Sequence, residues 1–186
     1  RERKTISKIL PEAVELTGGL FVCLPHDPID YIEKFSKCCG IAKIPVEEVS
    51  IKNILENEKE LTKDLTKAFY VPDAIVYPQK LINLLAKDIR AYEGTILTKH
   101  QVISIKQKNN FIYSVEVVHN QAKKIIECDG IINASGPWSN KITKLINQKI
   151  ELQLTKGSFL IFPQRIVSKA INRCRYPSNN DIMCPS

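Results

Sequence analysis

The sequence is poor in the residues and runs that mark several classes of protein. Its 186 residues include one methionine, one tryptophan and three histidines. No apolar run approaches the ~20 residues that a membrane-spanning helix needs. The opening Arg-Glu-Arg-Lys, with no apolar stretch after it, is unlike a signal peptide. These absences predict a protein that is soluble or peripheral to a membrane.

The seven glycines contain no G-x-G-x-x-G spacing. That spacing forms the phosphate-binding turn of a dinucleotide-binding βαβ unit, in which backbone amides approach a pyrophosphate. The sequence therefore offers no such unit of its own, and any nucleotide cofactor needs its phosphates bound by another part of a protein.

The six cysteines include no C-x-x-C pair, and Cys38-Cys39 is too closely spaced for the usual zinc or cluster ligands. We expect reduced thiols, as in a cytosolic protein. No Ser-His-Asp, paired-carboxylate or metal-ligand pattern is readable, so no metal is expected. The scattered histidines, His26, His100 and His119, favour surface or supporting roles over catalysis.

Positive charge exceeds negative charge, with a formal net charge of +7. The basic residues are spread along the chain without a run of five, and no basic stripe interleaves with aromatics, so nucleic-acid binding is not indicated. A small anionic ligand or an anionic membrane surface remains open. Hydrophobic residues make up 44% of the sequence and charged residues 25%, which suits one folded domain or parts of two.

Glycine and proline divide the first part of the chain into short elements. Asp27-Pro28 and Pro78 suit the first turn of a helix, and Gly40 is expected to end the first of these helices in the left-handed conformation. The stripe Leu81, Leu84, Leu85 and Ile89 predicts an amphipathic second helix. The pattern predicts helices over 1–16 (interrupted at Pro11), 27–39, 46–56 and 78–93, strands over 20–24 and 68–76, and a loop over 57–67.

The middle of the chain alternates apolar and polar residues between short Asn-rich links, as antiparallel strands do. The runs 102–106, 111–118 and 123–128 predict a three-stranded meander within residues 99–128. Residues 131–134 read as a buried strand before a Ser-Gly turn, and 138–146 as a helix. Strands are expected again in 151–162 and 168–183.

Several stretches resemble one family of flavoproteins. Gly130-Ile-Ile-Asn-Ala-Ser-Gly-Pro-Trp138 resembles its apolar strand followed by Asn-Ala-x-Gly-x-Trp. Residues 70–78 resemble its Val-Pro-Asp-Gly-x-Val-Asp-Pro, from which Ala74 and Tyr77 depart. Thr-Lys-Gly-Ser at 155–158 and Asn-Arg-Cys-Arg at 172–175 extend the match. Along nearly its whole length the chain is similar to FAD-dependent glycerol-3-phosphate dehydrogenases of the D-amino-acid oxidase superfamily, and most of all to the A-type subunit of the anaerobic enzyme.

The resemblance implies a mixed α/β fold. It is part of the FAD/NAD(P)-binding flavoprotein fold of the D-amino-acid oxidase type, with an antiparallel meander and part of the substrate-domain sheet, and without the N-terminal Rossmann unit. Residues 1–72 are expected in the substrate or cap domain, 73–147 in the FAD-binding domain with the meander at 99–128, and 148–186 back in the substrate-domain sheet. Both ends read as cut, so an internal fragment is expected.

The resemblance also implies site residues. FAD is the cofactor of the parent protein, and its expected contacts are Val102, Asn133, Ala134, Ser135, Gly136 and Trp138. The expected contacts of the substrate phosphate are Lys156, Arg173 and Arg175, because such cations bind phosphate through charge-assisted hydrogen bonds. No catalytic residue is assigned, since Phe159 stands where aerobic relatives carry a candidate histidine base.

The implied reaction is the oxidation of sn-glycerol 3-phosphate to dihydroxyacetone phosphate, with a hydride equivalent passing to the flavin. Electrons then leave through partner subunits to a quinone or another acceptor. The protein is expected in the cytoplasm or peripherally on the inner face of the cytoplasmic membrane. This fragment alone is expected to bind no FAD and to be inactive. Two alternatives remain: a non-catalytic truncated module, and a related FAD-dependent amino-acid or 2-hydroxy-acid oxidoreductase.

Overall fold

The computed structural model describes residues 2–109, 111–175 and 182–185, and the chain forms two compact units. The first unit contains Arg1–Tyr92 and Ser158–Ser186, and the second contains Glu93–Gly157. The chain thus leaves the first unit and later returns to it. From the sequence, domain boundaries were predicted at 72/73 and 147/148. The assignment of these parts to the substrate and FAD-binding domains stays a prediction.

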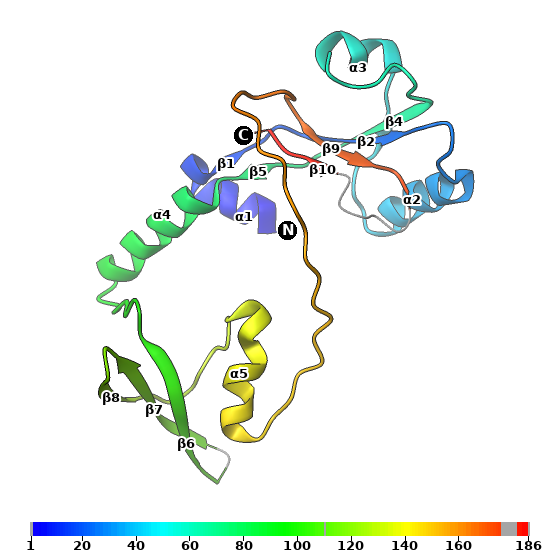
Figure 1. The fold of residues 1–186 in the computed structure, drawn as a ribbon. Coiled ribbons are helices and arrows are strands. Elements are labelled where there is room, and N and C mark those ends of the chain that lie inside the picture. The colour runs from blue at the N-terminus through cyan, green and yellow to red at the C-terminus, as the bar shows by residue number, and fades with distance from the viewer. Residues whose placement is uncertain (1, 110, 176–181, 186) are drawn as a thin grey trace. The chain divides into compact units, whose positions relative to one another are not determined.

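A five-stranded sheet forms the centre of the first unit (Figure 1), and its strand order is β10-β9-β2-β4-β3. β2 and β9 are parallel, and the other neighbours are antiparallel. Because β2 and β9 come from distant parts of the sequence, the sheet joins the two segments of this unit. The strands are β2 (Gly19–Cys23), β3 (Glu47–Glu48), β4 (Lys67–Val71), β9 (Ala170–Arg173) and β10 (Ile182–Met183).

Side chains alternate between the two faces of this sheet, and each face has its own apolar core. On β2, Leu20 and Val22 belong to one core, whereas Cys23 belongs to the other. The first face is covered by α3 (Ile51–Asn57) and the loop that follows it, and the second by α2 (Ile29–Ile41). Figure 1 shows the two helices on opposite sides of the sheet.

A two-stranded sheet also belongs to the first unit. It pairs β1 (Val14–Glu15) with β5 (Ile75–Val76) in antiparallel orientation. Before it come α1 (Glu2–Ile9) and a 3-10 turn (Pro11–Ala13), and after it comes α4 (Pro78–Ala91). The predicted helix over 1–16, interrupted at Pro11, is confirmed only in its first part, because Val14 and Glu15 pair with β5 as a strand. The predicted stripe of α4 is not buried within the described residues, since Leu85 and Ile89 are each 44% exposed.

The second unit is built on the predicted meander, which the structure confirms. Its strands β6 (Gln101–Lys108), β7 (Phe111–His119) and β8 (Ala122–Glu127) are antiparallel in the order β6-β7-β8. Asn120 and Gln121 both have positive φ, 48° and 67°, as a tight two-residue hairpin turn requires.

A short helical segment packs on this meander. It consists of a 3-10 turn (Gly136–Trp138), α5 (Ser139–Thr143) and a second 3-10 turn (Lys144–Ile146), which corresponds to the predicted helix over 138–146. The core of the unit is Ile105, Val115 and Val117. The apolar side chains packed against it from this segment are Ile142, Leu145 and Ile146.

Two predicted strands are absent from the described residues. The run 131–134 has no strand, and Ile132 is 95% exposed. The run 151–162 is likewise unpaired, with Phe159 85% and Ile161 90% exposed. An apolar run becomes a strand only where another backbone lies alongside to complete its hydrogen bonds, and among the described residues none does. The predicted strands in 168–183 are confirmed at β9 and β10, and 176–181 lie outside the described residues.

The helix ends also differ in detail from the expectation. α2 continues through Gly40, and the residue with left-handed φ is Lys43, at 53°. The predicted helix over 46–56 begins instead with strand β3 and becomes helical at Ile51. In the described part of the chain, no helix has the length and apolar character needed to span a membrane.

Candidate functional site

A turn in the second unit, residues 133–139, is held by one asparagine side chain. The Nδ2 of Asn133 donates to the carbonyl of Ser139 at 3.0 Å, and its Oδ1 accepts from the Oγ of Ser135 at 2.5 Å. The Oγ of Ser139 donates to the carbonyl of Gly136 at 2.7 Å. These contacts fix the path of the backbone through the turn, so Asn133 has a clear structural role there.

Gly136 lies at the exposed tip of this turn. Its φ is +54°, which favours glycine over residues with a side chain. No atom lies within 4 Å of the position that a β-carbon would take. Ala134 and Gly136 are exposed, and Trp138 is 61% exposed. The turn therefore presents small groups and accessible backbone, which fits the close approach of a flat ligand.

Val102 and Ile131, which lies just before this turn, pack against one apolar core. Val102, on β6, is half-buried and lies opposite Val117 in the sheet. Val102 and Ile131 both pack against the core of the second unit. The structure thus places all six predicted cofactor contacts in the same unit, with Val102 on the sheet and the others in or beside the turn.

The three basic residues predicted to contact the substrate divide between the two units. Lys156 is exposed in the unpaired segment of the second unit. Arg173 and Arg175 lie in the first unit at the end of β9, where the amide of Arg175 donates to the carbonyl of Arg173 at 3.1 Å.

Arg173 forms an ion pair with Asp27, which precedes α2. Its Nε donates to both carboxylate oxygens of Asp27, at 2.9 and 3.1 Å. One terminal nitrogen lies 2.8 Å from the carboxylate and 2.7 Å from the Nε2 of His26. Because a guanidinium can only donate, the His26 nitrogen is the acceptor in this contact.

The Asp27 carboxylate is buried and ionised. Burial acts to raise its pKa, but hydrogen bonds from Arg173 and from the Leu24 amide, together with the positive charge of Arg173, outweigh burial and lower the pKa. The Leu24 amide donates to Asp27 at 2.7 Å. The sequence placed Asp27 only at the start of a helix, because nothing in it signals a partner 146 residues away.

A cavity of about 350 Å³ adjoins this ion pair in the first unit. Most of its wall is apolar and comes from β2, β9, β10 and the loop after α3. Polar groups are contributed by Glu60, Thr62, Asn172 and Arg173. The charged lining residues described are thus one guanidinium, which Asp27 already contacts, and one carboxylate.

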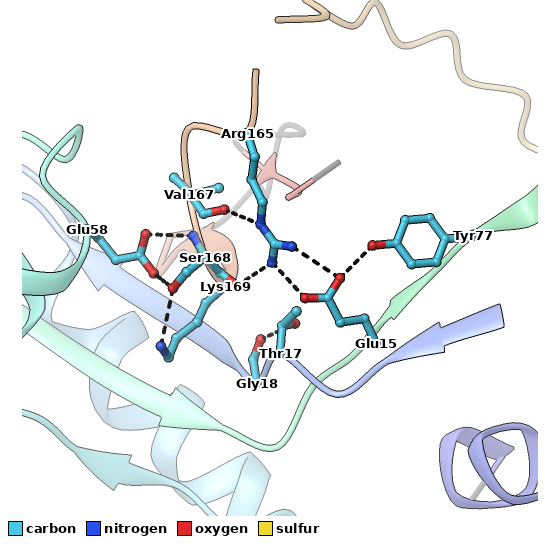
Figure 2. A network of polar contacts seen from close by, with 9 residues as sticks. All are labelled: Glu15, Thr17, Gly18, Glu58, Tyr77, Arg165, Val167, Ser168 and Lys169. Atoms are coloured by element: carbon cyan, nitrogen blue, oxygen red, sulfur yellow. Dashed lines mark hydrogen bonds and ion pairs between the residues drawn. The ribbon is translucent and has the colours of Figure 1, made fainter. Parts of the chain in front are cut away.

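A second polar network lies around the segment that leads into β9, and Figure 2 shows it. The two terminal nitrogens of Arg165 donate to the two carboxylate oxygens of Glu15 at 3.2 and 2.9 Å. Tyr77 donates its hydroxyl to the same carboxylate at 2.5 Å. The hydrogen bond from Arg165 is the main cause of a lowered pKa of Glu15, and the hydrogen bond from Tyr77 is the second cause. The hydrogen bond between Tyr77 and Glu15 also raises the pKa of Tyr77. Tyr77, one of the two departures from the family pattern, thus has a structural role.

The other half of this network is buried. Glu58 is 2% exposed, and its carboxylate accepts hydrogen bonds from the amide of Ser168, at 2.8 Å, and from the Ser168 hydroxyl. Together, Glu15 and Glu58 hold residues 165–168 in place. Among the residues that the structure describes, no group of three or more histidine, cysteine or acidic side chains is arranged to hold a metal ion.

The sequence and the fold match a known class of protein. Residues 1–185 match the FAD dependent oxidoreductase family, and the chain belongs to that family. The predicted fold class, a partial flavoprotein fold of the D-amino-acid oxidase type, is thereby confirmed.

Two curated relatives indicate the branch of the family. The chain is 31% identical to the A1-type subunit of anaerobic glycerol-3-phosphate dehydrogenase from Haloferax volcanii over 195 residues, covering 99% of this chain and 33% of the relative. It is 30% identical to the A-type subunit of the Escherichia coli enzyme over 186 residues, covering 99% and 34%. The predicted resemblance is confirmed, and the chain spans about a third of the length of these relatives.

A solved structure supports the same fold. The L-alpha-glycerophosphate oxidase of Mycoplasma pneumoniae, with FAD bound, superposes with a TM-score of 0.72 at 15% identity, covering 100% of this chain and 52% of the oxidase. The likeness concerns the fold. It places both units of this chain within a flavoenzyme architecture.

Proposed function

We propose that this chain is part of an FAD-dependent dehydrogenase that oxidises sn-glycerol 3-phosphate to dihydroxyacetone phosphate. The observation that carries the proposal is the match of 99% of the chain to glycerol-3-phosphate dehydrogenase subunits from two distant organisms. Family membership supports the class of reaction.

In this proposal the chemistry would be supplied by bound FAD, as the acceptor of a hydride equivalent in the oxidation at carbon 2 of the substrate. The turn at 133–138 and Val102 contact the cofactor in the whole protein. Gly136 supports this role, since its left-handed φ and open surroundings allow a ligand to reach the backbone. Asn133 keeps the turn in shape through its three hydrogen bonds.

Lys156, Arg173 and Arg175 are the proposed contacts of the substrate phosphate. Arginine binds phosphate through paired N–H donors, and lysine acts as a point charge. The ion pair with Asp27 uses donors of Arg173 and offsets its charge.

The proposed partners follow from the same resemblance. Electrons pass to further subunits and then to a quinone or another acceptor, because the relatives are named as subunits of a larger enzyme. We propose a cytoplasmic location, with peripheral attachment to the inner face of the membrane.

The test uses the full-length protein purified with its flavin. Reduction of a dye acceptor is followed under anaerobic conditions with sn-glycerol 3-phosphate, and in parallel with glycerol, L-proline, glycine and L-lactate. The expected result is turnover with glycerol 3-phosphate alone. Turnover with an amino acid or a 2-hydroxy acid instead would support the related oxidoreductase. A flavin-free protein that is inactive with every compound would support the non-catalytic module.

A further inference from the structure

Cys23 and Cys174 lie next to each other at the ends of two paired strands. The parallel register of β2 and β9 runs from Gly19 opposite Ala170 to Val22 opposite Arg173, and one further step places Cys23 opposite Cys174. The amide of Cys174 donates to the carbonyl of Val22 at 2.8 Å, so the pairing extends to this point.

The two side chains occupy the same face of the sheet. Both belong to the apolar core under α2, with Ile32 and Phe69, and both are 0% exposed. Neighbouring strands lie about 4.8 Å apart, within the Cα separation of about 4.4–6.8 Å that disulfides adopt. The backbone therefore already has the spacing that a bond between the two sulfurs requires.

The thiols also interact directly. Contact with Cys174 lowers the pKa of Cys23, and contact with Cys23 raises the pKa of Cys174. A sulfur with more thiolate character is the better nucleophile of a pair. The lower pKa of Cys23 favours it as the attacking thiol, with Cys174 as the resolving thiol.

We propose that Cys23 and Cys174 form an oxidation site, at which a low-molecular-weight disulfide converts the two thiols into a bond between β2 and the end of β9. Cys23 loses its proton and its sulfur attacks the small disulfide, which forms a mixed disulfide and releases one small thiol carrying that proton. Cys174 then loses its proton and attacks the sulfur of Cys23, which releases the second small thiol. Two protein thiols are oxidised, and one small disulfide is reduced to two thiols.

The position of the pair makes the reaction possible despite its burial. Cys23 is the last residue of β2, and Cys174 directly follows β9. Strand ends open more readily than strand centres, and such local opening admits a small reagent. The bond would fix the backbone next to Arg173 and Arg175. The other described cysteines with exposed side chains, Cys38 and Cys184, serve as internal comparisons.

The test equilibrates the purified protein in glutathione buffers of increasing oxidised fraction. Remaining thiols are blocked with N-ethylmaleimide, and the peptides are mapped by mass spectrometry. The expected result is a linked peptide joining Cys23 to Cys174, lighter than its reduced parts by two hydrogen atoms, with alkylation lost at both sites at the same buffer ratio. This map needs no variant. Cys38→Ser and Cys184→Ser should keep the link, and Cys23→Ala should abolish it.

A second form of the experiment does not depend on whether the oxidant can reach the two buried thiols in the folded protein. The protein is refolded from the reduced, denatured state in the same buffers, so both thiols meet the oxidant while the sheet forms. A link from Cys23 to Cys39, or full alkylation of Cys23 and Cys174 in this arm, would overturn the proposal. Mixed glutathione adducts at both sites, without a link, would overturn it as well.

Discussion

Asp27 and Arg173 are 146 residues apart in the sequence, and a guanidinium nitrogen of Arg173 lies 2.8 Å from the carboxylate of Asp27. The Asp27 side chain is 1% exposed and that of Arg173 is 19% exposed. The ion pair joins the segment before α2 to the end of β9. It therefore connects the two separate parts of the chain that build the first unit.

We expect Asp27→Asn to destabilise the first unit. The substitution removes the charge that two donors of Arg173 and the Leu24 amide contact, and a hydrogen bond to a buried charged group contributes about 1.5–3 kcal/mol. The free energy of unfolding, measured in urea, should fall by about that amount. Asp30→Asn, an exposed aspartate in the first turn of α2, is the matched control and should change it by less than about 0.5 kcal/mol. Equal effects of the two substitutions would contradict this account.

The same pair predicts a dependence on pH. The pKa of Asp27 is lower in the folded protein than in the unfolded chain. Its contribution is therefore complete above the unfolded pKa of about 4, and it is lost as the pH falls through the lower folded pKa. The difference in stability between the wild-type protein and Asp27→Asn should be constant from pH 7 to 5 and should shrink below about pH 4. A difference that grew in acid would refute the assignment.

Glu58 and Glu15 provide a matched pair of carboxylates that hold the segment 165–168. Glu58 is 2% exposed and accepts two hydrogen bonds from Ser168. Glu15 is more exposed, and solvent screens its contact with Arg165. Glu58→Gln should cost about 1–3 kcal/mol of unfolding free energy, and Glu15→Gln should cost less. Hydrogen exchange at Ser168 should accelerate in the first variant more than in the second. The reverse order would show that Glu15 is the stronger contact.

Gly136→Val should lower flavin occupancy in the full-length protein. A β-branched residue is strained at φ +54°, and its side chain would fill the open space beside the turn. The measurement is the flavin-to-protein absorbance ratio after desalting. Gly130→Ala is the control, because a β-carbon there also meets no atom within 4 Å and its φ is not left-handed. Full flavin content and normal turnover in Gly136→Val would place the cofactor elsewhere.

Arg175→Ala should raise the KM for sn-glycerol 3-phosphate and leave the flavin content unchanged. Loss of one charged hydrogen bond, about 1.5–3 kcal/mol, corresponds to a rise of roughly 10- to 150-fold. Lys63→Ala, in the exposed part of the loop after α3, is the control for the loss of a positive charge. An unchanged KM with normal flavin would remove Arg175 from the substrate site without affecting the cofactor assignment.

Local patterns were sufficient to predict the meander and most helices. The turn at Asn120 and the start of α4 at Pro78 each depend on neighbouring residues, and both were predicted correctly. The apolar run at Ile131 was predicted as a strand, but strand formation depends on a partner backbone, which the run itself does not reveal.

The candidate site likewise has features that the sequence predicted and features that it did not. Gly136 was identified from a short motif, and its left-handed φ agrees with the predicted turn. The ion pair of Asp27 was not predicted, because it depends on the parallel pairing of β2 and β9 across most of the sequence. Arg173 was selected for its charge, and sequence alone gave no sign that a buried carboxylate already contacts it.

The return of the chain to the first unit sets the order in which the protein can fold as it is synthesised. Residues 93–157 form contacts among themselves, so the meander can assemble as soon as it leaves the ribosome. β2 is made before β9 and pairs with β4, but its other edge stays open until β9 emerges about 150 residues later. During that interval the nascent chain exposes an unpaired strand edge, which is the kind of surface that chaperones protect and that aggregation exploits.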